Sequence, residues 1–302
     1  MTFFALLAAI LIEHFYPLPQ RRDTLLNRIL RYLSNQLNAG RMQHGILAWF
    51  LVIIPLTTGS SLIYFFLAHL SLWLAWLWNI AVLYVCIRFK ADSLIAGQIH
   101  QSLATGNLPA AQQLFARWRG ISLSASDTND LERLNIEAVL SSALQHLFGV
   151  IFWFALLSPA GPVGAVFYRT TEVLSKHWRI ASDGVFASFS QRMSRLANNW
   201  PARLTALSFA IAGNFEDAVY CWRSQASHWP DANQGIVLAS GAGALGVKLG
   251  MPVQQGSIER AELGLGNRAD NSCFGSTLSL IWRSLTIWLF LLLLVALAQL
   301  AR

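Results

Sequence analysis

Charged residues are scarce in this 302-residue chain, of which only 12% is Asp, Glu, Lys or Arg. A soluble domain usually carries about 25% charge. Hydrophobic residues make up 55% of the chain, and the mean hydropathy is +0.45. This composition excludes a disordered chain and an ordinary cytosolic enzyme. It predicts an all-α, polytopic helical membrane protein whose first partner is the lipid bilayer.

Cysteine is also scarce. Cys86, Cys221 and Cys273 are odd in number and far apart, and no Cys/His spacing typical of a ligand set occurs. This pattern argues against a disulfide framework and a zinc site. The net charge is +7, but no basic run alternates with aromatic residues, so nucleic acid is not an expected partner. In a membrane protein, excess Lys and Arg is typical of cytoplasmic loops.

Hydrophobic runs separated by polar stretches predict about four to six membrane segments, joined by cytoplasmic amphipathic helices, within a single integral membrane domain, 1–302. A basic amphipathic stretch, 20–42, is expected to lie on the membrane surface. With both termini outside, almost every Lys and Arg falls on one side. This asymmetry predicts a bacterial inner-membrane protein with most loops cytoplasmic. The predicted parts are an N-terminal helix 1–19, a membrane hairpin 45–89, a cytoplasmic helical segment 90–137, a second and partly re-entrant hairpin 138–176, a cytoplasmic or interfacial segment 177–278 and a final span 285–300.

Two cations in apolar surroundings are candidate ligand contacts. Arg169 lies three residues before Glu172 in the weak return of the second hairpin. An isolated charge at membrane depth costs about 2.5–3.5 kcal/mol, so the two side chains either pair or face a cavity, and a cavity would also suit a transporter. Pro201 predicts a helix start that places Arg203 in the first turn, where the helix dipole disfavours a cation. Arg203 then either binds an anion, such as a carboxylate or a lipid phosphate, or pairs with Glu216 or Asp217.

Two further patterns are weaker. GAGALG at 241–246 has the GxGxxG form of a dinucleotide loop, but it does not follow a predicted strand. Close packing of a small-residue helix face is therefore the favoured interpretation. Glu216 and Asp217, with His228 and Asp231, are residue types that can hold magnesium. Nothing in their spacing brings them together, so no metal site is predicted.

Several stretches resemble the CobD/CbiB family: SPAGPVGAVFYR at 158–169, WPARLTAL at 200–207 and GALGVKLG at 243–250. Its members include membrane-bound adenosylcobinamide-phosphate synthases, which use ATP to attach an aminopropanol phosphate arm to the corrin in cobalamin biosynthesis. For an active member, the resemblance implies ATP and Mg²⁺, a corrinoid or anionic small ligand, and an amide-forming ligase reaction. Together with the patterns above it gives these candidate ligand-binding residues, with no catalytic residue assigned: Glu137, Arg169, Glu172, Arg203, Thr205, Glu216, Asp217, Asn233, Gly243 and Gly246.

The chain departs from the polar motifs of the synthases. Glu137 matches the first Glu of their ESLAEN-x-x-DG stretch, and Asn233 matches the Asn of PNAGxPEAAMAGALGV. The later polar positions of the first motif fall on Ser141, Ser142, Gln145 and His146, and the Asn and Asp of YRxxNTLDSM fall on Glu172 and Ser175. Amide formation with ATP needs groups for Mg²⁺ and for transition-state charge, so these losses argue against the same reaction.

The start of the chain, Met1-Thr2-Phe3-Phe4 followed by Glu13, resembles the AmpE-like members of the family. These inner-membrane proteins are encoded beside a peptidoglycan amidase and are implicated in β-lactamase regulation. We therefore expect a non-catalytic signalling or accessory protein of the cell envelope. The alternative is a divergent adenosylcobinamide-phosphate synthase in cobalamin biosynthesis.

Overall fold

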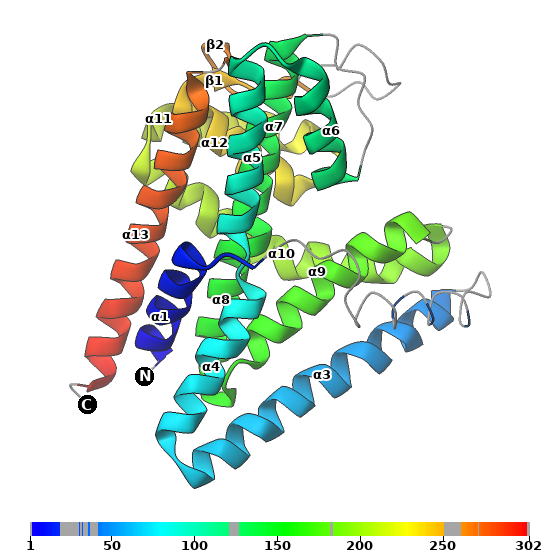
Figure 1. Ribbon diagram of the computed structural model, residues 1–302, viewed down its shortest axis with the longest axis vertical. Coiled ribbons are helices and arrows are strands. Elements are labelled where there is room, and N and C mark those ends of the chain that lie inside the picture. Colours follow the sequence, from blue (N-terminus) through cyan, green and yellow to red (C-terminus); the bar gives the residue numbers. More distant parts are fainter. Residues whose placement is uncertain are drawn as a thin grey trace. The chain divides into compact units, whose positions relative to one another are not determined.

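The computed structural model describes residues 2–18, 30, 32, 36, 42–120, 127–181, 184–250, 261–270 and 272–300. The basic stretch 20–42 thus lies almost wholly outside the described residues. Within them, helices make up nearly the whole fold (Figure 1), which confirms the all-α polytopic class. The helices long and apolar enough to cross a membrane are Met42–Leu70, Leu72–Ala104, Thr128–Leu156 and Cys273–Gln299.

The chain forms two compact units, each described by itself. Unit 1 contains Met1–Arg88, Gln145–Asn199 and Leu292–Arg302, and unit 2 contains Phe89–Leu144 and Trp200–Leu291. The predicted boundaries of the membrane and cytoplasmic segments stay predictions.

Unit 1 is built on three helices that pack against one another, α3 (Met42–Leu70), α4 (Leu72–Cys86) and α9 (Val163–Ala181) (Figure 1). Ser71 ends α3 and begins α4, because its extended backbone breaks the helix and its hydroxyl accepts the Trp73 N–H. The other elements of the unit are α1 (Thr2–Phe15), which packs on α4, η1 (Leu144–Phe148), α8 (Gly149–Leu156), which packs on α9, η2 (Ser158–Ala160) and the first part of α10 (Gly184–Ala212).

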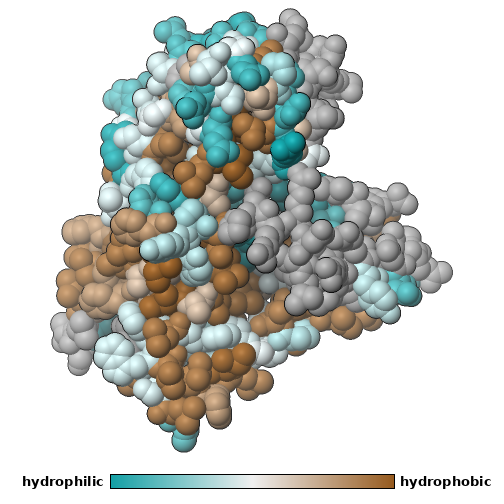
Figure 2. Space-filling model, viewed as in Figure 1, coloured by the Kyte–Doolittle hydropathy of each residue, from teal (hydrophilic) through white to brown (hydrophobic). Residues whose placement is uncertain are grey.

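Hydrophobic side chains point outwards from unit 1 as well as inwards. Figure 2 shows them gathered over α1 and α4. Phe15 of α1 and Trp73 of α4 are among the large hydrophobic residues exposed there. A water-facing surface of this kind would promote aggregation, whereas lipid chains solvate it. The return of the second hairpin is the regular helix α9, which is not among the four helices apolar enough to span.

Unit 2 surrounds one helix, α7 (Thr128–Ala143), with α5 (Phe89–Ala104), α6 (Leu108–Arg119) and α12 (Ala232–Leu245). A parallel pair of short strands joins Val247 to Asn267 and Lys248 to Arg268. The remaining elements are the end of α10, α11 (Phe215–Gln225), η3 (Ala226–His228), the strands β1 (Val247–Lys248) and β2 (Asn267–Arg268), and the first part of α13 (Cys273–Leu300).

The predicted helix start at Pro201 is wrong. Helix α10 runs from Gly184 to Ala212 with Pro201 inside it. Asn198 stands three residues before Pro201 and could have capped a helix beginning there, but its side-chain amide donates to the Glu172 carboxylate and to the Ser194 carbonyl. Arg203 is therefore not in a first turn, and the helix dipole gives no reason for it to bind an anion.

The GAGALG stretch lies within and just after α12 rather than between a strand and a helix. Gly241 packs against Leu140 of α7, and Gly243 packs against the backbone of Asp217 and Ala218 on α11. Gly246 ends the helix in the left-handed conformation, with φ of 67°. These contacts agree with the small-residue packing interpretation.

Gly243→Ala should destabilise unit 2, because the added Cβ would clash with the Asp217 carbonyl. Overpacking of this kind costs about 1–3 kcal/mol, which thermal unfolding in detergent can detect. Gly97→Ala is the matched control. Gly97 is also helical, and a Cβ there meets nothing within 4 Å, so alanine should leave the melting temperature unchanged or raise it. Equal melting temperatures for both variants would contradict this packing.

Candidate functional site

Helix α7 concentrates polar side chains in the interior of unit 2. Every residue from 131 to 143 is buried, because neighbouring helices pack around it. Burying such groups costs several kcal/mol unless they are hydrogen-bonded, so their partners indicate what the interior is built to hold. The buried polar residues are Glu132, Arg133, Asn135, Glu137, Ser141 and Ser142.

Asp92 of α5 joins two other helices. The Trp118 indole N–H of α6 donates to its Oδ1 at 3.0 Å, and the Ser142 hydroxyl of α7 donates to its Oδ2. Ser142 occupies a position where the resemblance expects Asn. The substitution therefore keeps a hydrogen-bond donor facing a buried carboxylate.

Glu137 binds a backbone turn. The Gly250 N–H donates to its Oε1 at 2.9 Å, and Arg133 Nε lies 3.9 Å from the same oxygen. Arg133 Nη2 is also 3.1 Å from Asp130 Oδ1, although within the described residues neither guanidinium nitrogen meets hydrogen-bond geometry. Gly250 has φ of 83°, and a Cβ there would clash with the Ala261 carbonyl. Only glycine suits this approach to the carboxylate.

His100 and Glu132 form a dyad that runs from the interior to the surface. His100 Nδ1 donates to Glu132 Oε1 at 3.0 Å, with side chains 29% and 0% exposed. The imidazole stacks on Phe274, with ring centres 4.7 Å apart. Asp270 lies beyond the dyad, and hydrogen bonds from Ser272 and Cys273 hold the pKa of its carboxyl below the ordinary value. Because Nδ1 is hydrogen-bonded to the Glu132 carboxylate, Nε2 is the ring nitrogen that can exchange a proton with a substrate.

The structure distributes the residues predicted from sequence between both units. In unit 1, Glu172 accepts hydrogen bonds from Ser194 and Asn198, and Arg169 lies one turn earlier on α9. The other eight lie in unit 2, where Asp217 contacts Gly243. Their places are α7 for Glu137, the end of α10 for Arg203 and Thr205, the first turn of α11 for Glu216 and Asp217, the first turn of α12 for Asn233, and its C-terminal end for Gly243 and Gly246.

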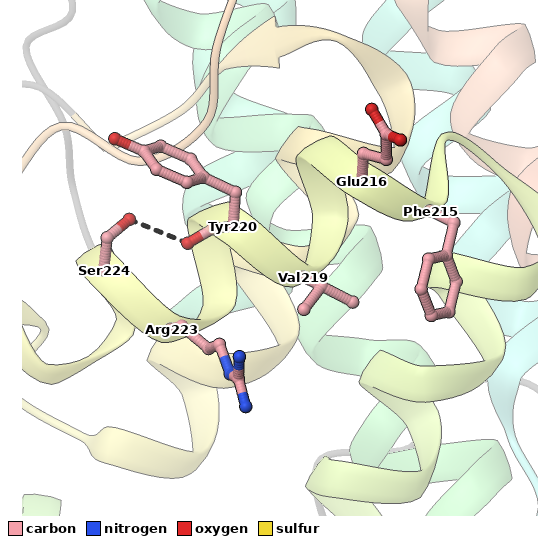
Figure 3. A pocket seen from close by; sticks show the side chains of 6 residues that line it. All are labelled: Phe215, Glu216, Val219, Tyr220, Arg223 and Ser224. Atoms are coloured by element: carbon pink, nitrogen blue, oxygen red, sulfur yellow. Dashed lines mark hydrogen bonds between the residues drawn. The ribbon is translucent and has the colours of Figure 1, made fainter.

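A shallow depression of about 540 Å³ lies along α11 (Figure 3). Glu216 is one of its lining residues, but the remainder of its wall is largely apolar and comes from this one helix. Among the described residues, no three His, Cys, Asp or Glu side chains are placed to share a metal ion. We therefore assign no magnesium ligands and derive no step through a metal.

Residues 6–298 match the model of a family described as CobD/Cbib protein. The chain belongs to the CobD/CbiB family. It is 31% identical to the cobalamin biosynthesis protein CobD of Stutzerimonas stutzeri, over 97% of each chain. A protein of the same name from Chromobacterium violaceum is 32% identical, over 69% of this chain and 67% of that protein. No solved structure matches.

These comparisons contradict the expected non-catalytic role in β-lactamase regulation. The similar CobD/CbiB-family proteins are named for cobalamin biosynthesis, which supports the alternative. The AmpE-like interpretation gave decisive weight to the polar residues missing from known motifs. One of the residues that replace them, Ser142, donates a hydrogen bond to the buried Asp92 carboxylate.

Glu137→Ala should destabilise the protein, because it leaves the buried Gly250 N–H without its acceptor and removes a carboxylate near the Arg133 guanidinium. An unsatisfied buried group costs about 1–3 kcal/mol, measurable by thermal unfolding in detergent. Glu262→Ala is the control. Glu262 pairs with Lys248 at 2.7 Å on the surface, and exposed pairs contribute about 0–1 kcal/mol. A larger loss for Glu262→Ala than for Glu137→Ala would refute the assignment.

Proposed function

We propose that this CobD/CbiB-family protein is a membrane-bound, ATP-dependent amide-forming enzyme of cobalamin biosynthesis. It joins the amine of an aminopropanol phosphate to a corrinoid carboxyl group. The observation that carries the proposal is the full-length similarity to CobD, 31% over 97% of each chain. That extent leaves no large part of the relative without a counterpart. Because ATP is cytoplasmic, we also propose an inner-membrane location with the site on the cytoplasmic side.

Amide formation of this kind needs a base. ATP activates the carboxyl group, and the amine then attacks the acyl carbon. An amine is protonated at neutral pH, so it must lose a proton for the nitrogen lone pair to form the new bond. As the C–N bond forms, the C–O bond to the phosphate-containing leaving group breaks, and that group takes the electron pair.

His100 is the residue that we propose as this base. Its Nε2 takes the proton from the amine nitrogen, while Glu132 holds Nδ1 and stabilises the imidazolium. Two observations support the role: Glu132 is wholly buried, which fixes the ring, and His100 is partly exposed, which leaves it within reach of a substrate. Glu132 is thus a positioning residue.

The residues predicted from the resemblance stay proposed ligand contacts. Glu137 is supported by its buried place beside the Gly250 turn. Arg203, Asn233 and Thr205 lie in the same unit, where a guanidinium and neutral donors suit the anionic groups of ATP and of the phosphate substrate. The Thr205 hydroxyl is buried and has no hydrogen-bond partner among the described residues.

Expression of this chain should restore cobalamin-dependent growth to a bacterium that lacks its own adenosylcobinamide-phosphate synthase and is supplied with precursors from before that step. An empty vector is the negative control, and a known synthase gene is the positive control. Absence of growth, with the protein detected in the membrane fraction, would overturn the proposed function.

His100→Gln should lower kcat by about 10²–10⁴, the usual contribution of a general base, with little change in KM. It should also flatten the pH profile of kcat, which a purely structural role would not do. His69→Gln, at the exposed end of α3, is the matched control and should behave as the unmodified protein. An unaltered pH profile in an active His100→Gln enzyme would show that another group is the base.

A further inference from the structure

The part of α10 that belongs to unit 2 has an apolar face which the described chain leaves uncovered. Trp200, Leu204, Leu207 and Ile211 follow one another at intervals of four, three and four residues, the spacing of one helical face. All four side chains are exposed, Trp200 to 64% and Ile211 to 56%. They form a continuous stripe, which we call the α10 face.

The opposite side of the same helix is tightly packed and consists mostly of small residues. The Ala206 carbonyl oxygen accepts a hydrogen bond from the Ser240 hydroxyl of α12, with the two oxygens 2.8 Å apart. The Ser208 carbonyl accepts the Ser284 hydroxyl of α13 at 3.2 Å. Thr205 and Ser208 are buried. Apart from Phe209, small residues thus lie inside and large apolar residues lie outside. Close packing of small residues between helices, with large apolar side chains facing away, is typical of helices in lipid.

The hydrogen bond from Ser284 also indicates at what depth in the membrane the α10 face lies. Ser284 lies within the apolar helix Cys273–Gln299, which is long enough to span. The segment 200–212 therefore lies beside a spanning helix, close to Arg283 of that helix. At 1.5 Å per residue, Trp200 to Ile211 extends over about 16 Å, whereas a bilayer core is about 30 Å thick. This part of α10 can lie in one leaflet but cannot cross by itself.

We propose that the α10 face is inserted among the lipid acyl chains of the leaflet in which the Arg283 end of α13 lies. Hydropathy over a full span length does not reveal it, because α10 also contains Arg192, Arg195 and Arg203. Along α11 the surface carries charged and hydroxyl side chains among apolar ones. There Phe215, Val219 and Arg223 form one row, and Glu216, Tyr220 and Ser224 form the next (Figure 3). Tyrosine and arginine beyond an apolar face are typical of the membrane interface.

The α10 face can be tested by spin labelling of the full chain in liposomes of bacterial phospholipid. The label is placed at Leu207→Cys in a background where Cys86, Cys221 and Cys273 are alanine. Accessibility is measured to oxygen, which concentrates in acyl chains, and to a water-soluble nickel chelate. Ser227→Cys on η3 is the aqueous control, and Leu291→Cys on α13 is the lipid control. Both positions are exposed in unit 2.

We expect the label at position 207 to match the Leu291→Cys control, with oxygen access exceeding nickel access. Nickel access equal to that of the Ser227→Cys control would overturn the proposal. Low access to both reagents would also overturn it, because a protein surface such as a second copy of the chain would then cover the face. Ile211→Cys repeats the test if the first variant is not recovered, and neither result depends on the enzymatic activity.

Discussion

The structure of unit 2 depends on the cost of leaving polar groups unsatisfied inside it. Helix α7 is buried from 131 to 143 and yet carries charges, and its neighbours supply partners for several of its polar groups. Asp92 meets Ser142 and Trp118, and Gly250 brings its N–H to Glu137. In such a buried interior a dipole or a charge acts more strongly than in water. The His100–Glu132 dyad lies where this interior reaches the surface.

The bilayer imposes a second constraint, which explains why large hydrophobic side chains face outwards on other helices. Outward-facing leucine, isoleucine and tryptophan are stable only in an apolar solvent, and they occur on α1 and α4 of unit 1 and on the end of α10 in unit 2. Under the proposed function, an enzyme held in this way works on water-soluble ATP at the membrane surface.

Composition and hydrophobic runs predicted the fold class correctly, because lipid demands long apolar helices. The family was predicted correctly from the resemblance of three stretches, 158–169, 200–207 and 243–250. The helix start at Pro201 was wrong, since a local capping rule yields to the tertiary hydrogen bonds of Asn198. The dyad could not be predicted, because His100 and Glu132 are 32 residues apart and belong to no motif. The function was misjudged because missing motif residues were counted as lost chemistry, whereas the relatives of this chain are named for cobalamin biosynthesis.

The most direct test of the central claim is a reaction with purified protein in detergent. ATP, magnesium, an aminopropanol phosphate and a corrinoid carboxylic acid are mixed, and the corrinoids are analysed by mass spectrometry. The account predicts a new corrinoid whose mass equals that of the two substrates less water, formed only when ATP is present and consumed with it. Unchanged corrinoid in the presence of folded protein and all substrates would contradict the account.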